Sequence, residues 1–227
     1  MSNSLIEIDL DQTPLRDANR QMQDATAEAF RLLHPRGIHA LAAGLTQPVQ
    51  VTIAGHAGFY CAGMNQQAAV TVEGHAGVGL AENMMSGAVR VTGNASQSAG
   101  ATGHGGLLVV EGDCASRCGI SMKGIDIVVG GSVGHMSAFM GQAGSLAVLG
   151  DAGPDLGDSL YEARLYVRGR VDSLGADCKE KEMTAHHLDK LARLLDRAKV
   201  KADPRDFRRY GSARRLYHFQ TDNLDAY

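Results

Sequence analysis

The sequence predicts an all-β fold, a single-stranded right-handed parallel β-helix of about seven to eight coils with 19 residues in each. Three observations predict it. A glycine recurs at a constant interval without slippage, at Gly55, Gly74, Gly93, Gly112, Gly131, Gly150 and Gly169. One aliphatic residue precedes each glycine by two positions and another by four, and an alanine or glycine follows each by seven. A fixed period of this length is typical of a stacked solenoid.

Each of these columns has a structural reason. The two aliphatic residues face the same way, because side chains alternate along a strand. The glycine ends that strand and turns the chain, and the alanine or glycine column marks a second corner. No coil buries its own aliphatic face, but stacking at about 4.8 Å per coil does so. The crossover between parallel strands is expected to be right-handed.

The repeat divides the chain into three predicted parts. They are an N-terminal strand–helix cap (1–29), the parallel β-helix (30–177), and a C-terminal helix with an arm rich in arginine and aromatic residues (178–227). A chain of 227 residues is long enough to bury a sizeable core.

The N-terminal part is expected to cover one end of the solenoid. Residues 5–10 alternate as in a strand, and a helix follows with Thr13 as its cap and Pro14 in its first turn. Residues 30–48 predict a degenerate first coil, with Arg36 in the glycine position when the columns are shifted back by one repeat. An open solenoid end exposes unpaired strand edges, so a cover is needed there.

A second helix is predicted from Thr184 to about Lys199, with an apolar stripe made by Leu188, Leu191, Leu194, Leu195 and Ala198. The outward column three positions before each glycine becomes apolar in the later coils, at Val109, Val128, Ala147 and Tyr166. An outward apolar strip needs a cover. The sequence leaves two alternatives for that cover, the C-terminal helix and a partner chain.

The end of the chain interleaves arginines (205, 208, 209, 214, 215) with the aromatic residues Phe207, Tyr210, Tyr217 and Phe219. This pattern also occurs in nucleic-acid binders. The net charge of −3 and the lack of a nucleic-acid motif argue against that class. We expect an extended arm that docks on a neighbouring subunit.

We predict no catalytic, cofactor-binding or metal-binding residue in this chain. Cys114 and Cys118 resemble half of a metal site, but Cys118 shares its column with Cys61, about 14 Å away at the coil spacing. Buried thiols are therefore expected. His56 and His75 stack in a polar corner column, where solvated turn residues are expected. With no run of 18 apolar residues and no leader, we expect a cytoplasmic protein without membrane contact.

A competing hypothesis makes the solenoid itself an enzyme. Polar residues near its corners would then form a groove, namely Glu82, Asn83, Arg117, Lys123 and His135. The sequence alone leaves this alternative open.

Several stretches carry a resemblance to a known family: the Gly-x-x-Gly corners at 55–58 and 74–77, HALAAGL at 39–45 and PRDFRR at 204–209. With them, nearly the whole chain resembles the GXGXG family, which includes the C-terminal β-helix domain of the glutamate synthase large subunit. Stretches 79–87, 118–124, 130–136 and 206–213 resemble, more narrowly, the free-standing members that serve as B subunits of N-methylglutamate synthases.

This resemblance implies a non-catalytic scaffolding subunit of a hetero-oligomer. Its implied partners are a class II amidotransferase-like subunit and a glutamate synthase-like barrel subunit that carries FMN and an iron–sulfur cluster. The implied reaction converts methylamine and L-glutamate to N-methyl-L-glutamate and ammonia. A glutamine-dependent glutamate synthase-like complex and a formylmethanofuran dehydrogenase-type complex are the alternatives.

Overall fold

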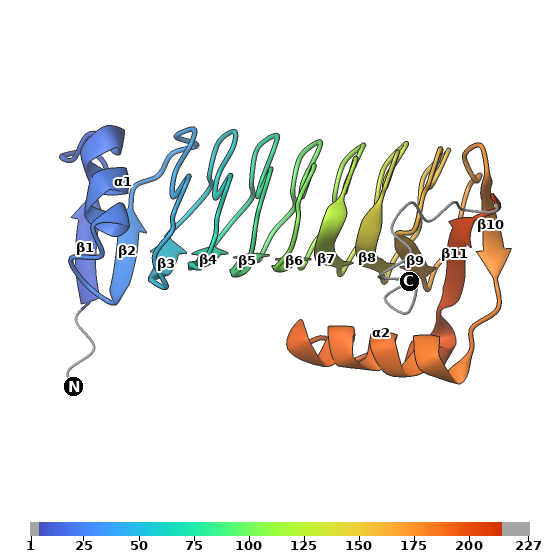
Figure 1. The fold of residues 1–227 in the computed structure, drawn as a ribbon. Helices are drawn as coiled ribbons and strands as arrows, with labels where there is room; N and C mark the ends of the chain where they lie inside the picture. The colour runs from blue at the N-terminus through green and yellow to red at the C-terminus, as the bar shows by residue number, and fades with distance from the viewer. Residues whose placement is uncertain (1–4, 215–227) are drawn as a thin grey trace.

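The computed structural model describes residues 5–214, which form a parallel β-helix with a helix near each end (Figure 1). The N-terminal elements are β1 (Leu5–Asp9), α1 (Leu15–Gln23) and β2 (Ala29–Leu33). The coils contribute β3 (Gln50–Ile53), β4 (Ala69–Val72), β5 (Ala88–Val91), β6 (Leu107–Val110), β7 (Lys123–Val129), β8 (Ala143–Val148) and β9 (Arg164–Val167). The C-terminal elements are β10 (Cys178–Lys181), α2 (Ala185–Arg197), the short 3₁₀ helix η1 (Pro204–Asp206) and β11 (Arg208–Ser212).

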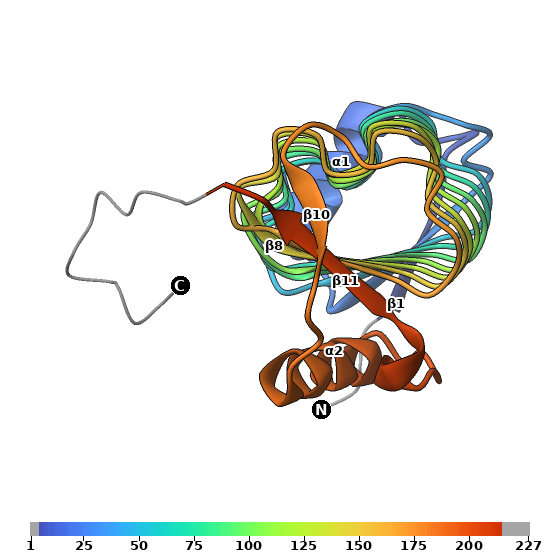
Figure 2. The ribbon, with the colours of Figure 1, turned by 90° about the vertical axis from the view of Figure 1, so that its right-hand side faces the viewer.

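All described strands belong to one sheet, in the order β1 to β9, then β11, then β10. Strands β1 to β9 pair in parallel, each with the next in the chain, and Figure 2 shows the coils superimposed along the axis. Ile53 pairs with Val72, and Val72 pairs with Val91. The predicted stacking of like positions is therefore confirmed.

The alanine and glycine column has a conformational cause that the sequence did not reveal. In six coils this residue has a positive φ, between 52° and 70°, at Ala62, Ala81, Gly100, Gly119, Ala138 and Gly157. The position also points into the interior, since a Cβ added to Gly100 would lie 2.7 Å from Cδ1 of Ile127. Because the backbone is left-handed and the interior is crowded at this position, only the smallest residues, alanine and glycine, occupy the column.

The N-terminal part corrects two expectations. Helix α1 begins after Pro14, which is the cap residue, and no side chain caps the helix, so Thr13 is not the cap. Leu32 pairs with Ile53, a separation of two residues more than the regular repeat. The first coil is therefore two residues longer than the others, and Arg36 does not stand in a glycine position.

Helix α2 covers the outward apolar strip, as Figures 1 and 2 show. Its buried leucines pack in one cluster with the strip; the members are Leu107, Val109, Val128, Ala147, Tyr166, Leu191, Leu194, Leu195, Ala198 and Phe207. Arg90 adds a polar anchor by donating to the carbonyl of Ala198 at the C-terminal end of the helix. The cover of the strip is thus a segment of this chain.

The arm, as far as the described residues reach, also folds onto its own chain, which corrects the expected docking on a neighbour. Strand β11 lies antiparallel between β9 and β10. Phe207 and Tyr210 are buried in the apolar clusters. The arginines of this segment bond to acidic side chains or backbone carbonyls of the same chain. Arg215, Tyr217 and Phe219 lie outside the described residues.

Candidate functional site

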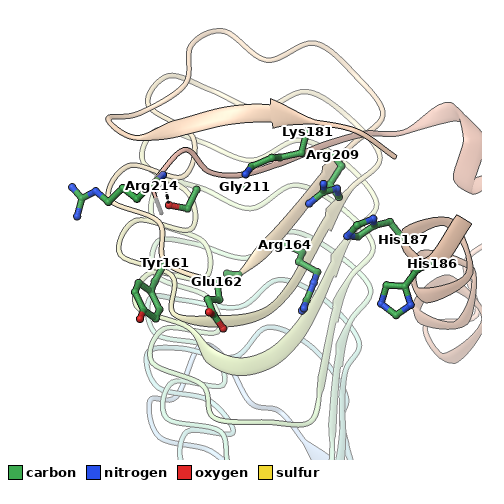
Figure 3. Close-up of a pocket in the computed structure, with 11 residues that line it drawn as sticks. Tyr161, Glu162, Arg164, Lys181, His186, His187, Arg209, Gly211 and Arg214 are labelled. Carbon is green, nitrogen blue, oxygen red and sulfur yellow. Dashed lines mark hydrogen bonds between the residues drawn. The ribbon is translucent and has the colours of Figure 1, made fainter. Parts of the chain in front are cut away.

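A strongly charged concavity lies at the C-terminal end of the solenoid, beside the start of α2 (Figure 3). We call it the basic pocket; its volume is about 450 Å³. Cationic and imidazole side chains dominate its lining, at Arg164, Lys181, His186, His187, Arg209 and Arg214. In Figure 3 these residues come from β9, the β10–β11 pair, the first turn of α2 and, for Arg214, the segment that follows β11.

The sheet register positions the central residues of this pocket. Arg164 is the Cα partner of Ser145 on β8, and Tyr166 is the partner of Arg209 on β11. Arg164 and Tyr166 lie two positions apart on β9, so both face outward, on the side that α2 covers. The sheet thus brings together two arginines, Arg164 and Arg209, that are distant in the sequence.

The charges of the pocket repel one another. Burial lowers the pKa of Arg209, and the nearby Arg164 lowers it further. Burial also lowers the pKa of His187, and the charges of Arg209, His186, Arg164 and Lys190 add to that effect. Such shifts indicate a site where further positive charge is unfavourable.

Some of this charge is compensated. Arg214 forms an ion pair with Asp177, and Glu162 also lines the pocket. Neither Arg164 nor Lys181 forms an ion pair with a residue between 5 and 214. The pocket therefore keeps an excess of positive charge within the described structure.

A smaller cavity of about 300 Å³ adjoins the basic pocket through His186, which lines both. Ser145, Asp126 and Lys190 are among its other residues, and Asp126 is paired with Arg197 at 2.9 Å. Ser145 is only 1% exposed, and its hydroxyl has no hydrogen-bond partner in the described part of the chain.

Tyr166 shares this property. Its side chain is fully buried, and its hydroxyl has no partner within residues 5–214. Burial raises the pKa of this hydroxyl, and the charges of Arg164 and Arg209 offset part of that rise. Among the described residues, Ser145 and Tyr166 carry the only two buried side-chain polar atoms without a partner. Buried polar groups are normally satisfied, so two orphans on neighbouring strands require an explanation.

Sequence reasoning did not find this pocket, although a signal was present. The column five positions before each glycine holds Gln50, Ala69, Ala88 and Leu107, and then turns polar at Asp126, Ser145 and Arg164. The change occurs in the coils that α2 covers. A polar column beneath a predicted apolar helix stripe indicates a site at the edge of the covered region.

The five residues of the alternative enzymatic groove are spread over three coils of the rod. The coil of Asn83 lies two coils from that of Arg117, about 10 Å along the axis at the strand spacing. Asn83 instead accepts a hydrogen bond from the Thr102 hydroxyl at 2.6 Å, and His135 lies 3.4 Å from Asp155. Both residues thus bond to the adjacent coil at their own corner rather than to one another.

The polar corner column with His56 and His75 forms a ladder along the rod. The two imidazole rings stack at 5.0 Å, and Nδ1 of His56 accepts the backbone N–H of His75 at 2.9 Å. The same bond recurs in the following coils, with Asn94, Asp113, Ser132 and Asp151 as acceptors. Asp151 therefore contacts the backbone of Arg170, whereas the guanidinium of Arg170 pairs with Asp172.

The cysteines lie among apolar residues. Cys61, Cys114 and Cys118 are buried, and burial raises the pKa of Cys61 to about 12. Cys178, which the sequence did not place, lies on β10 beside the apolar core, and burial raises its pKa to about 11. The raised pKa values keep the thiols of Cys61 and Cys178 protonated and unreactive at neutral pH.

One acidic cluster was missed by sequence reasoning. Asp9, Asp11 and His34 bring their ligand atoms within 4.8 Å of one another, the only such group among residues 5–214. His34 pairs with Asp9 at 2.8 Å, and Arg36 pairs with Asp11 at 2.6 Å. These contacts tie β1 to the first corner, so we interpret the cluster as an ion-pair network.

The surface also carries exposed apolar side chains. Four of the seven large ones in the described part lie on two adjacent coils, at Phe59, Tyr60, Met64 and Met85. We call this group the aromatic–methionine patch. No helix among residues 5–214 has the length and apolar character needed to cross a membrane.

Comparison with curated proteins shows one clear relationship. The chain is 62% identical over 225 residues to Protein GlxC of Rhizobium meliloti (strain 1021), and the match covers 97% of this chain and 99% of that protein. No family model matches the chain, and no solved structure matches it. Identity at this level over nearly the full length establishes common ancestry and fold. The chain therefore belongs to the GlxC family.

Proposed function

We propose that this chain is a scaffolding subunit of a flavin-dependent, glutamate synthase-like complex. The observation that carries the proposal is the aromatic–methionine patch, because large apolar side chains exposed on two adjacent coils favour contact with another protein. Phe59 stacks on His39 with ring centroids 4.5 Å apart, so part of this patch is rigid before any partner binds. A preformed surface loses little entropy on association.

The identity of the complex, its reaction and its partner subunits follow from the resemblance to the GXGXG family. The complex is N-methylglutamate synthase, which converts methylamine and L-glutamate to N-methyl-L-glutamate and ammonia. A class II amidotransferase-like subunit and a barrel subunit with FMN and an iron–sulfur cluster are the partners, and the complex is cytoplasmic. A glutamine-dependent glutamate synthase-like complex is the close alternative, and a formylmethanofuran dehydrogenase-type complex is the more distant one.

Purification from the native host tests this proposal. The tagged chain is expected to retain a flavoprotein with an iron–sulfur spectrum and an amidotransferase-like chain in fixed ratio. N-methylglutamate formation from methylamine and glutamate distinguishes the first complex from its alternatives. A chain that purifies alone at native expression levels contradicts the scaffold.

The patch itself is tested by substitution. The double variant Phe59→Ser/Tyr60→Ser is expected to lose the partners and keep its fold, because both side chains are about half exposed. Met140→Ser is the control, since Met140 is 49% exposed on a distant coil. Equal loss of partners in both variants excludes the patch as the contact.

The cofactor assignment has a separate test. The isolated chain is expected to bind neither FMN nor iron, so its visible spectrum and iron content stay at background. Stoichiometric flavin or an iron–sulfur spectrum in the purified single chain overturns the assignment of those groups to a partner.

A further inference from the structure

We propose that the basic pocket binds a small oxyanion with two negative charges, a dicarboxylate or a phosphate, between Arg164 and Arg209. Arg164 comes from the last coil and Arg209 from β11, and both line the pocket. Guanidinium groups bind carboxylates and phosphates through paired hydrogen bonds. The geometry thus places two such donors around one concavity.

Charge favours an anion in this pocket. Arg164, Arg209 and Lys181 line it, and the acidic side chains that oppose them are Glu162, Glu182, whose charge partly offsets the lowering of the Arg209 pKa, and, through Arg214, Asp177. Two cations close to one another raise the free energy of the empty site. A dianion removes that repulsion, while a monoanion removes only part of it.

Two buried hydroxyls lie beside these arginines in the sheet. Ser145 is the sheet neighbour of Arg164, and Tyr166 is the sheet neighbour of Arg209. Neither hydroxyl has a partner among the described residues, and of the two only Ser145 lines a cavity, the one that adjoins the basic pocket. An anion that extends past His186 into that cavity accepts a hydrogen bond from Ser145, and Tyr166 does not contribute.

The start of α2 also favours an anion. His186 and His187 of its first turn line the pocket, no acidic residue stands in that turn, and no side chain caps the helix. The first-turn N–H groups and the helix dipole favour an anion at this end.

The size of the site limits the ligand. A volume of about 450 Å³ is within the range of small-molecule pockets. The concavity is bounded by β9, β11 and α2, so it suits a compact ligand better than a polymer (Figure 3).

Calorimetry on the full chain at low, constant ionic strength tests the proposal. The probes are inorganic phosphate, succinate and glutarate, with acetate as a singly charged control. At least one dianion is expected to bind with one site per chain and to do so more tightly than acetate. Comparing phosphate with the two dicarboxylates identifies which class of oxyanion provides the two negative charges of the ligand. No binding of any of the three dianions at millimolar concentration overturns the proposal.

Matched variants locate the site. Arg164→Gln is expected to weaken binding about tenfold to hundredfold, the range for a charged hydrogen bond. Arg170→Gln is the control: it removes the same charge from an exposed residue beyond the other end of β9 and is expected to leave affinity unchanged. An equal loss of affinity in both variants indicates non-specific electrostatic attraction of the anion and overturns the proposal.

The Ser145→Ala variant distinguishes a role of this hydroxyl in ligand binding from a purely structural role, because the two roles predict different changes in stability and affinity. The variant is expected to be as stable as the parent without ligand, or more stable, because it deletes a buried hydroxyl that no described residue satisfies. Its affinity for the dianion is expected to fall about two- to tenfold. A destabilised variant with unchanged affinity contradicts the assignment of this hydroxyl to the ligand.

Discussion

Helix α2 is held by a few leucines, so a single truncation is expected to release it. Leu191, Leu194 and Leu195 are 0%, 4% and 2% exposed against the outer face of the sheet. Each buried leucine contributes about 1.5–3 kcal/mol. Leu191→Ala is expected to cost about 2–5 kcal/mol, since it also leaves a cavity. Alanine has the higher helix propensity, so the loss comes from packing.

The effect is expected to be local. Each coil contacts only its neighbours, so stability is approximately a sum over coils and their interfaces. Native-state hydrogen exchange measures this directly. The opening free energy of α2 amides is expected to fall by about 2–4 kcal/mol in Leu191→Ala, while amides of β1 to β3, at the opposite end of the rod in Figure 1, keep their protection.

Leu188→Ala is the matched control, because Leu188 lies on the same helix and is only partly buried. It is expected to change α2 exchange by less than about 1 kcal/mol. Two results refute the reasoning. Either α2 amides keep their protection in Leu191→Ala, or amides throughout the solenoid lose as much protection as those of α2.

Three further predictions concern the coils and their N-terminal end. Asp113→Ala removes the acceptor for a backbone N–H of the next coil and is expected to cost about 0.5–1.5 kcal/mol in urea unfolding, whereas Asp113→Asn keeps an acceptor and costs less. Gly100→Ala is expected to cost about 1–3 kcal/mol through positive φ and contact with Ile127 Cδ1, and Ile127→Val in the same chain is expected to recover part of it in thermal melts. Hydrogen bonding to Asp9 raises the pKa of His34, so the stabilisation of this pair is complete below the usual value of 6.5 and is lost as pH rises through the raised pKa. In an NMR titration, Asp9→Asn is expected to return the His34 pKa toward 6.5; an unchanged pKa contradicts the coupling.

The regular coils were predictable because one constraint repeats in every coil. The glycine of each coil lies against the backbone of the coil before it, as Gly93 does against Gly74, where an added Cβ would approach the carbonyl oxygen to 2.6 Å. Only glycine fits that contact, so the spacing of glycines determines the register of β3 to β9. The first coil escapes this constraint. Its corner contains Pro35, and the coil is two residues longer than the others, so the regular interval misplaces its strand.

The C-terminal arm was harder to predict, because its partners are distant in the sequence. Arginines alternating with Phe207 and Tyr210 are compatible with docking on another subunit or on this chain. Which of the two surfaces the arm binds depends on whether β9 has an edge that no other strand occupies. It has one, since Arg208 to Tyr210 of β11 pair with Leu165 to Val167 of β9. Local sequence patterns carry no information about that edge.

The strands that end the solenoid also build the basic pocket. Strand β11 runs antiparallel to β9, and the outer strand β10 exposes Lys179 and Glu180, so no further parallel coil is added at this end. Arg209 belongs to this closing strand, and its Nε donates to the carbonyl of Glu182 at 2.9 Å. A substitution of Arg209 therefore perturbs both the end cover and the ligand site. Arg164 lies on a regular coil and makes no ion pair with a described residue, so its substitution separates anion binding from closure of the rod.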